Sequence, residues 1–536
     1  MYQSLLSRRY LTRKVMPLLA AVAVALSTAM VLITWSVMGG FLKTLLESGR
    51  EVIGDVKIDW AGAGFPYYDE LVERLEADEL IAAAAPRLET FGMIGLPGDR
   101  AEPAAIVGIE PESFSRVTGY EGWLYWKPID EPTSKDAEGE DRRLAPLFEL
   151  AQLLDWPFEL NEQTIGRLRR SWDDVLEAGR TLTAPNPRTG EPVAAAVIGI
   201  ELSGFNRRKV SWYDIGLPIR VRPDGTQEVI RTVLPINGTI TLNTAVFDGS
   251  GKGVDQVTRI VPVANEFQTG VHEIDKRTVF VRMDLLQEMM NMDRAERLVE
   301  PDDPFAIEID PVTGEERFAQ PTTVVDPARV TTVLVRAGEG ASVDEVVERC
   351  RAIFAEFAAA HPGEVPPANA VTIETWEDIN RTLIEAVKKE TGLVLFVFSF
   401  ISLTAVFLVW AIFWSMVSEK TRDIGILRSL GASRSGVAWL WLRYAIVIGL
   451  VGAIAGGLIA YAIVVNINPI HEWLGEAFGF QIWDPSVYYF TRIPSEVNPR
   501  HATIVLVGGI AAAVAGSALP AMRAARMHPV KALRFE

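Results

Sequence analysis

Four long apolar segments dominate the hydropathy pattern of the chain. They cover residues 16–38, 391–417, 437–465 and 502–520, and only the third contains a Lys, Arg, Asp or Glu, which is Arg443. A bilayer's hydrocarbon core of about 30 Å needs about 20 helical residues to span it, so each segment is long enough. Arg443 lies near one end of its segment, where its long side chain can reach the headgroups. The pattern predicts four transmembrane helices, the first too long for the apolar core of a cleaved signal peptide.

The stretch between the first two spans alternates strand and helix patterns. Strands are expected at 52–60, 104–109, 331–335 and 371–375, and helices at 68–77 and 342–357. This order predicts an α/β porter-like part. Short β-rich runs between 193 and 281, broken by turns such as Pro223-Asp224-Gly225, predict a β-rich part inserted at about 191–285. The region around 131–190 has no functional interpretation.

Helical patterns also extend both spans into this stretch. Residues 40–49 place Leu42, Leu45 and Leu46 on one face. At the other end, Thr375 can cap a helix with Asp378 three residues later. The predicted fold is an α-helical membrane protein with four transmembrane helices and a large α/β extracytoplasmic domain between the first and second. Its expected parts are residues 1–42, 43–390 and 391–536.

The charge distribution predicts how the chain is oriented. The 536 residues carry a net charge of −17, while residues 1–42 and 391–536 each carry +4, so residues 43–390 carry −25. Basic residues flank spans on the cytoplasmic side. We therefore expect both termini and the 418–436 loop inside, and the acidic domain outside. The acidic balance also argues against nucleic-acid binding.

The chain has few of the cysteines and histidines that metal sites use, and its one stretch that resembles a catalytic motif is incomplete. Cys350 is the single cysteine, and the five histidines lack metal-ligand spacing. Gly249–Gly253 resembles a phosphate-binding loop, but Val246 occupies its first glycine position and Gly253 follows Lys252 where Ser or Thr is required. We interpret that stretch as a hairpin turn. An ATPase motif is therefore not expected in this chain.

The loop between the second and third spans contains a short amphipathic helix pattern. Over residues 419–431, apolar positions recur at three-residue spacing (Ile424, Leu427, Leu430) and at four-residue spacing (Ile426, Leu430). Arg422 and Arg428 flank them, and Gly431 can end the helix. A helix this short needs a surface to order it. The pattern fits docking to a protein and an interfacial helix on lipid equally well.

Four stretches resemble one family. Glu419–Ala432 resembles the coupling segment of MacB/FtsX-class permeases of ABC transporters, and Leu519–Glu536 resembles their C-terminal signature. Thr375–Glu390, together with Val487–Tyr489 and Ile493–Val497, is similar to LolC/LolE-type lipoprotein-releasing permeases.

The resemblance implies a function. The chain would be a multi-pass permease of the bacterial inner membrane with its large domain in the periplasm. It would extract lipoprotein cargo from the outer leaflet by mechanotransmission and pass it to a LolA-like carrier. A LolD-like ATPase dimer would bind ATP and Mg, with no cofactor held by this chain, and a second permease chain would complete a homo- or heterodimer.

The resemblance also implies two sites. The ATPase-docking residues of the coupling helix would be Arg422, Ile424, Ile426, Leu427, Arg428 and Leu430. A cargo cavity would be lined by Met30, Thr34, Trp35, Met38, Phe396, Phe400 and Leu403. Small residues of the third and fourth spans, Gly452 and Gly456 and then Gly508, Ala512 and Gly516, would instead serve close helix packing.

Two alternatives stay open. One is a MacB-like export permease for another amphiphile. The other is an FtsX-like transmembrane scaffold that controls a cell-wall hydrolase, although the 348 residues between the first two spans favour lipoprotein release.

Overall fold

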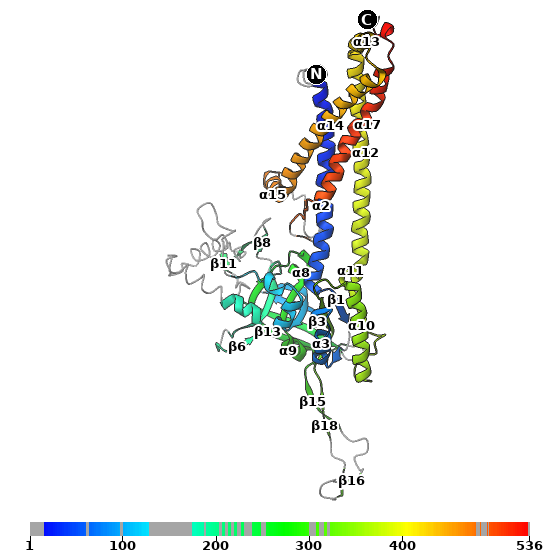
Figure 1. Cartoon of the computed structure of the whole chain (residues 1–536). Coiled ribbons are helices and arrows are strands. Elements are labelled where there is room, and N and C mark those ends of the chain that lie inside the picture. The colour runs from blue at the N-terminus through cyan, green and yellow to red at the C-terminus, as the bar shows by residue number, and fades with distance from the viewer. Residues whose placement is uncertain are drawn as a thin grey trace. The chain divides into compact units, whose positions relative to one another are not determined.

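The computed structural model divides into two compact units (Figure 1). One comprises Met1–Leu45, Arg381–Trp483 and Arg492–Glu536, and the other Leu46–Asn380 with Asp484–Thr491. The residues described are 15–60, 64–96, 100–127, 174–186, 189–202, 206–208, 213–215, 219–221, 227–229, 238–247, 253–299, 307–309, 316–318, 322–478, 483, 490 and 492–533. Three stretches interpreted from the sequence lie outside the described residues in whole or in large part: 131–190, Gly249–Gly253 except for Gly253 itself, and Val487–Tyr489.

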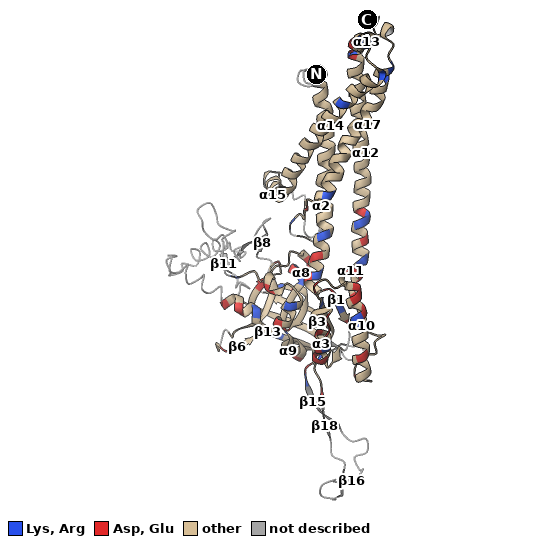
Figure 2. Cartoon of the chain, viewed as in Figure 1, with Lys and Arg blue, Asp and Glu red and all other residues tan. Residues whose placement is uncertain are grey.

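The first unit is built from four long helices. They are α2 (Val15–Ile53), α12 (Arg381–Glu419), α14 (Arg434–Val465) and α17 (Pro499–Arg526), and all are long and apolar enough to cross a membrane. Each predicted span lies inside one of them. Figure 2 shows almost no charged residues along their apolar stretches. The shorter helices are α13 (Thr421–Ser429), α15 (Ile467–Phe478) and α18 (Pro529–Leu533).

Small residues set the packing of α14 and α17. A Cβ added at Gly456 would lie 2.4 Å from the Ala25 carbonyl oxygen of α2, and one at Gly516 would lie 2.7 Å from the Val406 oxygen of α12. Close helix approach is therefore confirmed at these positions. Gly508 is different, because a Cβ there meets nothing within 4 Å, and Gly509 instead approaches Thr28. The packed face of α17 thus includes Gly516 of the predicted stripe, but Gly509 and not Gly508 belongs to it.

The second unit contains a nine-stranded sheet. Its order is β12-β13-β7-β14-β4-β3-β20-β1-β21, and an additional β12–β3 pairing closes six of the strands into a ring. In chain order the strands are β1 (Val56–Asp59), β3 (Ile81–Leu96), β4 (Arg100–Ile109), β7 (Ala196–Gly199), β12 (Thr239–Phe247), β13 (Gly253–Phe267), β14 (Thr278–Arg282), β20 (Thr332–Ala337) and β21 (Thr372–Thr375).

This sheet corrects the prediction of a separate β-rich insertion at 191–285. Strands β7, β12, β13 and β14 come from that region, yet β14 pairs with β4 in parallel and β12 pairs with β3. The long strands β3 and β13 make this possible, because each is long enough to pair with more than one neighbour. The β-rich residues therefore complete the same sheet as the flanking α/β residues.

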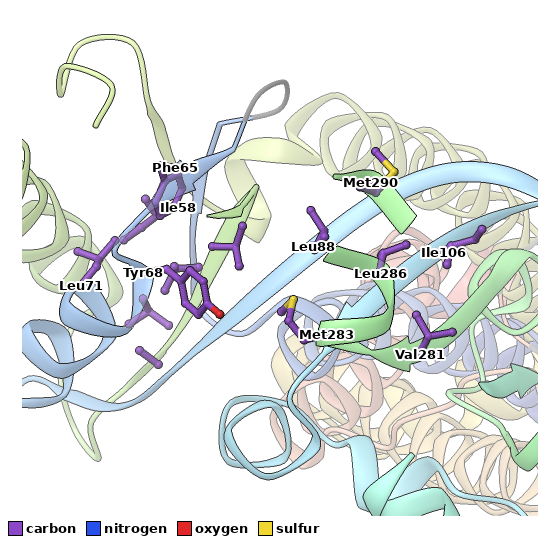
Figure 3. Packing of buried hydrophobic residues seen from close by; sticks show 14 of the residues in the cluster. Ile58, Phe65, Tyr68, Leu71, Leu88, Ile106, Val281, Met283, Leu286 and Met290 are labelled. Atoms are coloured by element: carbon purple, nitrogen blue, oxygen red, sulfur yellow. The ribbon is translucent and has the colours of Figure 1, made fainter. Parts of the chain in front are cut away.

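Short helices cover this sheet. They are α3 (Tyr68–Glu76), α4 (Pro111–Val117), α5 (Tyr120–Trp123), α8 (His272–Arg277), α9 (Met283–Met290), α10 (Val343–Ala360) and α11 (Trp376–Ile379). Figure 3 shows side chains of α3 and α9 packed with strand residues such as Leu88 and Ile106. Burial of these apolar side chains is the main stabilising contribution of the unit.

The remaining strands form two-stranded pairs. These are β2 (Phe65–Pro66) with β19 (Arg329–Val330), β5 (Thr183–Pro185) with β6 (Pro192–Ala194), β8 (Asn206–Arg208) with β9 (Tyr213–Ile215), β10 (Ile219–Val221) with β11 (Gln227–Val229), β15 (Ala295–Val299) with β18 (Thr322–Asp326), and β16 (Ile307–Ile309) with β17 (Glu316–Phe318).

Two helix ends show how local sequence acts. The expected strand at 52–60 begins only at Val56, because α2 continues to Ile53 and Gly54, at φ 73°, then turns the chain. The predicted Thr375–Asp378 capping box is confirmed: the Thr375 hydroxyl accepts a hydrogen bond from the Asp378 backbone N–H at 3.0 Å. The helix that it starts ends at Ile379, and α12 begins separately at Arg381.

Candidate functional site

Helix α13 connects two spanning helices and has two unlike faces. It lies where the amphipathic pattern predicts a helix, and Gly431, at φ 95°, follows its end. Ile424 is 3% exposed and packs among Val417, Val437 and Trp441. On the other face Ile426 is 44% exposed and Leu430 is 80% exposed. The helix is therefore anchored by one apolar face and presents a second one.

This arrangement divides the six predicted docking residues. Arg422, Ile426 and Leu430 are exposed, and Leu427 and Arg428 are half-buried. Ile424 differs from the other five, because its side chain is buried in the helical core and reaches the surface only at the cavity beside α13, so a docking role for it stays a prediction. Three- and four-residue spacing marks both faces of a short helix alike, so the sequence pattern could not separate them.

A cavity of about 320 Å³ lies beside α13. Leu427 lines it together with Pro17 of α2 and with Val437 and Trp441 of α14. The Trp441 Nε1 group is buried and has no hydrogen-bond partner among the described residues. At the rim, the Lys420 ammonium lies 2.9 Å from the Asp423 carboxylate. Ile424 and Ile426 line this cavity as well, whereas Leu430, which is 80% exposed, is not among its lining residues.

Helix α18 adds a surface that the sequence reading did not assign to docking. It packs against α13 through contacts that leave Ala532 buried and Val530 60% exposed. Nearby on α17, the Arg523 guanidinium lies 4.0 Å from the centre of the Trp414 ring. Arg526 is also exposed, so the apolar residues of α13 and α18 have basic neighbours (Figure 2). In the sequence, the only indication of this surface is that the apolar residues Val530 and Ala532 lie two positions apart in a short helix and so cannot both face α13.

The residues of the predicted cargo cavity are not enclosed within this chain. Met30, Phe396, Phe400 and Leu403 are exposed, while Thr34, Trp35 and Met38 are half-buried. The Phe396 and Phe400 rings contact each other at 5.1 Å between centres. Trp35 instead stacks on His501 of α17, with ring centres 4.4 Å apart. The two predicted walls are thus largely uncovered, and the cavity that they would form remains a prediction.

Comparison with known proteins shows similarity in the C-terminal region. The FtsX-like permease C-terminal family matches residues 395–529. LolC, a lipoprotein-releasing system transmembrane protein of Xylella fastidiosa strain Temecula1, is 27% identical over 164 residues, which cover 31% of this chain and 40% of LolC. LolE of Haemophilus influenzae is 27% identical over 22% of this chain and 28% of LolE.

Other matches carry different names. The Bacillus subtilis ABC transporter permease YtrF is 31% identical over 22% of this chain and 27% of YtrF. Among solved structures, the periplasmic region of MacB from Actinobacillus actinomycetemcomitans aligns with 63% of this chain and 97% of that region, at 10% identity and a TM-score of 0.26.

The family match and the matches to LolC and LolE confirm the expected resemblance to LolC/LolE-type ABC transporter permeases. The chain spans about two fifths of the length of the LolC relatives it matches. The matches therefore do not by themselves give the activity, the substrate or the partners of the whole chain.

Proposed function

We propose that this chain, which carries an FtsX-like permease domain over residues 395–529, is the permease subunit of an ATP-driven lipoprotein-releasing transporter. It would extract lipoproteins from the outer leaflet of the bacterial inner membrane and pass them to a periplasmic carrier. The observation that carries the proposal is α13, a short helix within that domain that exposes Ile426 and Leu430 between two spanning helices.

The proposed ATPase-docking surface consists of the exposed side chains of this region. We define it as Arg422, Ile426 and Leu430 of α13 and Val530 of α18. Apolar side chains surrounded by basic residues suit a partner groove with an apolar floor and an acidic rim. The partner would be a LolD-like ATPase dimer, which would bind ATP and Mg. The half-buried Leu427 and Arg428 support the surface from behind.

Helix α12 is the proposed path for mechanical coupling. It has 39 residues and is therefore about 58 Å long, and it leads directly into α13. A helix of this length transmits a push at one end as a movement of the other. Each acyl CH₂ held in lipid contributes about 0.8 kcal/mol to membrane attachment. A lipoprotein anchor with several acyl chains therefore needs work from ATP to leave the bilayer.

The uncovered aromatic faces are the proposed site for cargo and for the second permease chain. Phe396, Phe400 and Leu403 of α12 would form one wall, and Met30, Thr34, Trp35 and Met38 of α2 another. Exposed apolar residues on a spanning helix are ordinary against lipid, but adjacent aromatic rings also suit an acyl chain. A homodimer and a heterodimer both fit this proposal.

Release of a different amphiphile is a second candidate, because YtrF, 31% identical over 22% of this chain, is named an ABC transporter permease without reference to lipoproteins. Purification of the complex with identification of its bound acylated protein separates the two. Recovery of a triacylated lipoprotein supports lipoprotein release, whereas recovery of another amphiphile alone supports export.

The docking surface is tested by Leu430→Asp. The side chain is 80% exposed in this chain, so the substitution should leave the fold intact. In the complex, however, the substitution would bury a charge at an apolar contact, which costs several kcal/mol. The affinity of a complex with a micromolar Kd would then fall by more than about tenfold. The measurement is co-purification of the ATPase from membranes.

Two variants serve as controls. Ser435→Asp adds the same charge at an exposed position outside α13 and should retain the ATPase. Ile424→Asp places the charge in the helical core and should reduce the yield of folded permease. Full ATPase recovery with Leu430→Asp would refute docking and favour an interfacial helix on lipid.

A further inference from the structure

A second cavity, of about 310 Å³, lies between α2, α14 and α17. Its walls are apolar and include Leu32 of α2, Ile454 and Leu458 of α14, and Leu506 of α17. Ile454 and Leu458 are also exposed, so the cavity is open at the side of the helices. We refer to it as the α2/α14/α17 groove. An apolar space of this kind does not retain ordered water, and in a membrane it lies open to lipid chains.

One end of the groove is polar. There the Trp35 ring stacks on the His501 ring, and Glu496 and Asn498 also line the cavity. The Glu496 carboxylate accepts a hydrogen bond from Lys43 at 2.9 Å, and its backbone N–H donates to the Ser36 oxygen at 3.0 Å. The negative charge of Glu496 is therefore compensated within the chain.

One arginine, Arg500, lies next to this polar end without lining the cavity itself. Arg500 is exposed in the first turn of α17, next to His501. The Asn498 side chain accepts from the Arg500 backbone N–H at 2.9 Å and so caps the helix. The groove thus joins an apolar slot to a polar end that has an exposed arginine one residue away, which complements an acyl chain bearing a phosphate.

We propose that the α2/α14/α17 groove binds a membrane phospholipid, with one acyl chain along Ile454, Leu458 and Leu506 and its phosphate beside Arg500. The occupant is a bilayer lipid rather than cargo, because the apolar residues along the slot, Ile454, Leu458 and Leu506, belong to α14 and α17, whereas the adjacent aromatic rings proposed for cargo belong to α12; Trp35 of α2 is common to both sites. In the orientation that the charge distribution predicts, this lipid belongs to the outer leaflet; occupancy of the groove does not depend on that orientation.

Photolabelling of the full chain tests this proposal. The chain is reconstituted in vesicles of phosphatidylethanolamine and phosphatidylglycerol containing a trace of phosphatidylglycerol with a diazirine in one acyl chain. Mass spectrometry should locate the label on peptides of α14 and α17 that line the groove. Gly457→Trp should reduce that labelling at least several-fold, because Gly457 lines the groove and a Cβ there already lies 3.1 Å from Leu506.

Gly508→Trp is the matched control. It adds the same ring to a spanning helix at a position where a Cβ meets nothing within 4 Å, and it should leave groove labelling unchanged. Ala502→Phe is a second filling variant in case Gly457→Trp does not fold. Arg500→Gln should weaken competition by unlabelled phosphatidylglycerol.

Two results would overturn the proposal. One is equal labelling of the groove peptides in the wild type, Gly457→Trp and Ala502→Phe. The other is labelling that a synthetic triacylated peptide displaces and unlabelled phospholipid does not, since the groove would then hold cargo. Neither result bears on ATPase docking at α13, so failure here leaves the proposed function standing.

Discussion

Asp275 is the residue whose surroundings most clearly couple protonation to stability. Its buried carboxylate accepts hydrogen bonds from the Thr269 N–H and hydroxyl at 2.7 Å and from the Gly270 N–H at 3.1 Å. Burial raises its pKa to about 7, although these hydrogen bonds act in the opposite direction. Because that pKa lies above the unfolded value of about 4, the folded state holds this proton more tightly than the unfolded chain. The protonated Asp275 therefore stabilises the fold at low pH, and this stabilisation is lost as the pH rises through about 7.

Asp275→Asn should therefore destabilise the protein more at about pH 5 than at about pH 8. The amide cannot accept every hydrogen bond that the carboxyl group accepts, so a loss of about 1–3 kcal/mol is expected at low pH. Thermal unfolding of the detergent-solubilised chain at the two pH values measures the difference. Asp293→Asn, at an exposed position, should show no such pH dependence. An effect of Asp275→Asn that is independent of pH would contradict this account of Asp275.

At the scale of elements, close contact between α2 and α14 depends on the absence of a side chain at Gly456. Gly456→Leu would place carbon atoms where the Ala25 backbone oxygen lies and should cost about 1–3 kcal/mol through overpacking. Gly508→Leu adds the same side chain to α17 in open space and should be nearly neutral. The melting temperatures of both variants in detergent provide the measurement. Equal melting temperatures would mean that α2 and α14 do not pack at this position.

For the whole molecule, the main prediction is its orientation in the membrane. In a Cys350→Ser background, a membrane-impermeant maleimide should label Glu348→Cys from outside and Ser435→Cys only after permeabilisation. Both positions are exposed in the structure. The reverse pattern would invert the orientation inferred from charge. Wild-type Cys350 should stay unlabelled, because it is fully buried and burial raises the pKa of its thiol to about 12.

Much of the element order was predictable from the sequence because its causes are local. A helix that crosses a bilayer must be apolar along its own length, and the four segments that satisfy this requirement lie in α2, α12, α14 and α17. The Thr375–Asp378 cap likewise depends on two residues three positions apart. Strand pairing is not local in this sense, which is why β12 and β14 were assigned to a separate insertion and not to the sheet of β3 and β4.

The sequence by itself thus determined the number of apolar spans, the sign of the net charge of the stretches between and beyond them, and the presence of a short helix at α13. Only the tertiary structure decided which face of each helix is covered. Ile424 and Ile426 are chemically alike, yet one packs on α14 and the other is exposed. Gly509 rather than Gly508 meets α2, and Trp35 meets His501 rather than Phe400. Periodicity locates an apolar stripe, but the neighbour that covers it comes from residues distant in the chain, and that choice depends on packing in three dimensions.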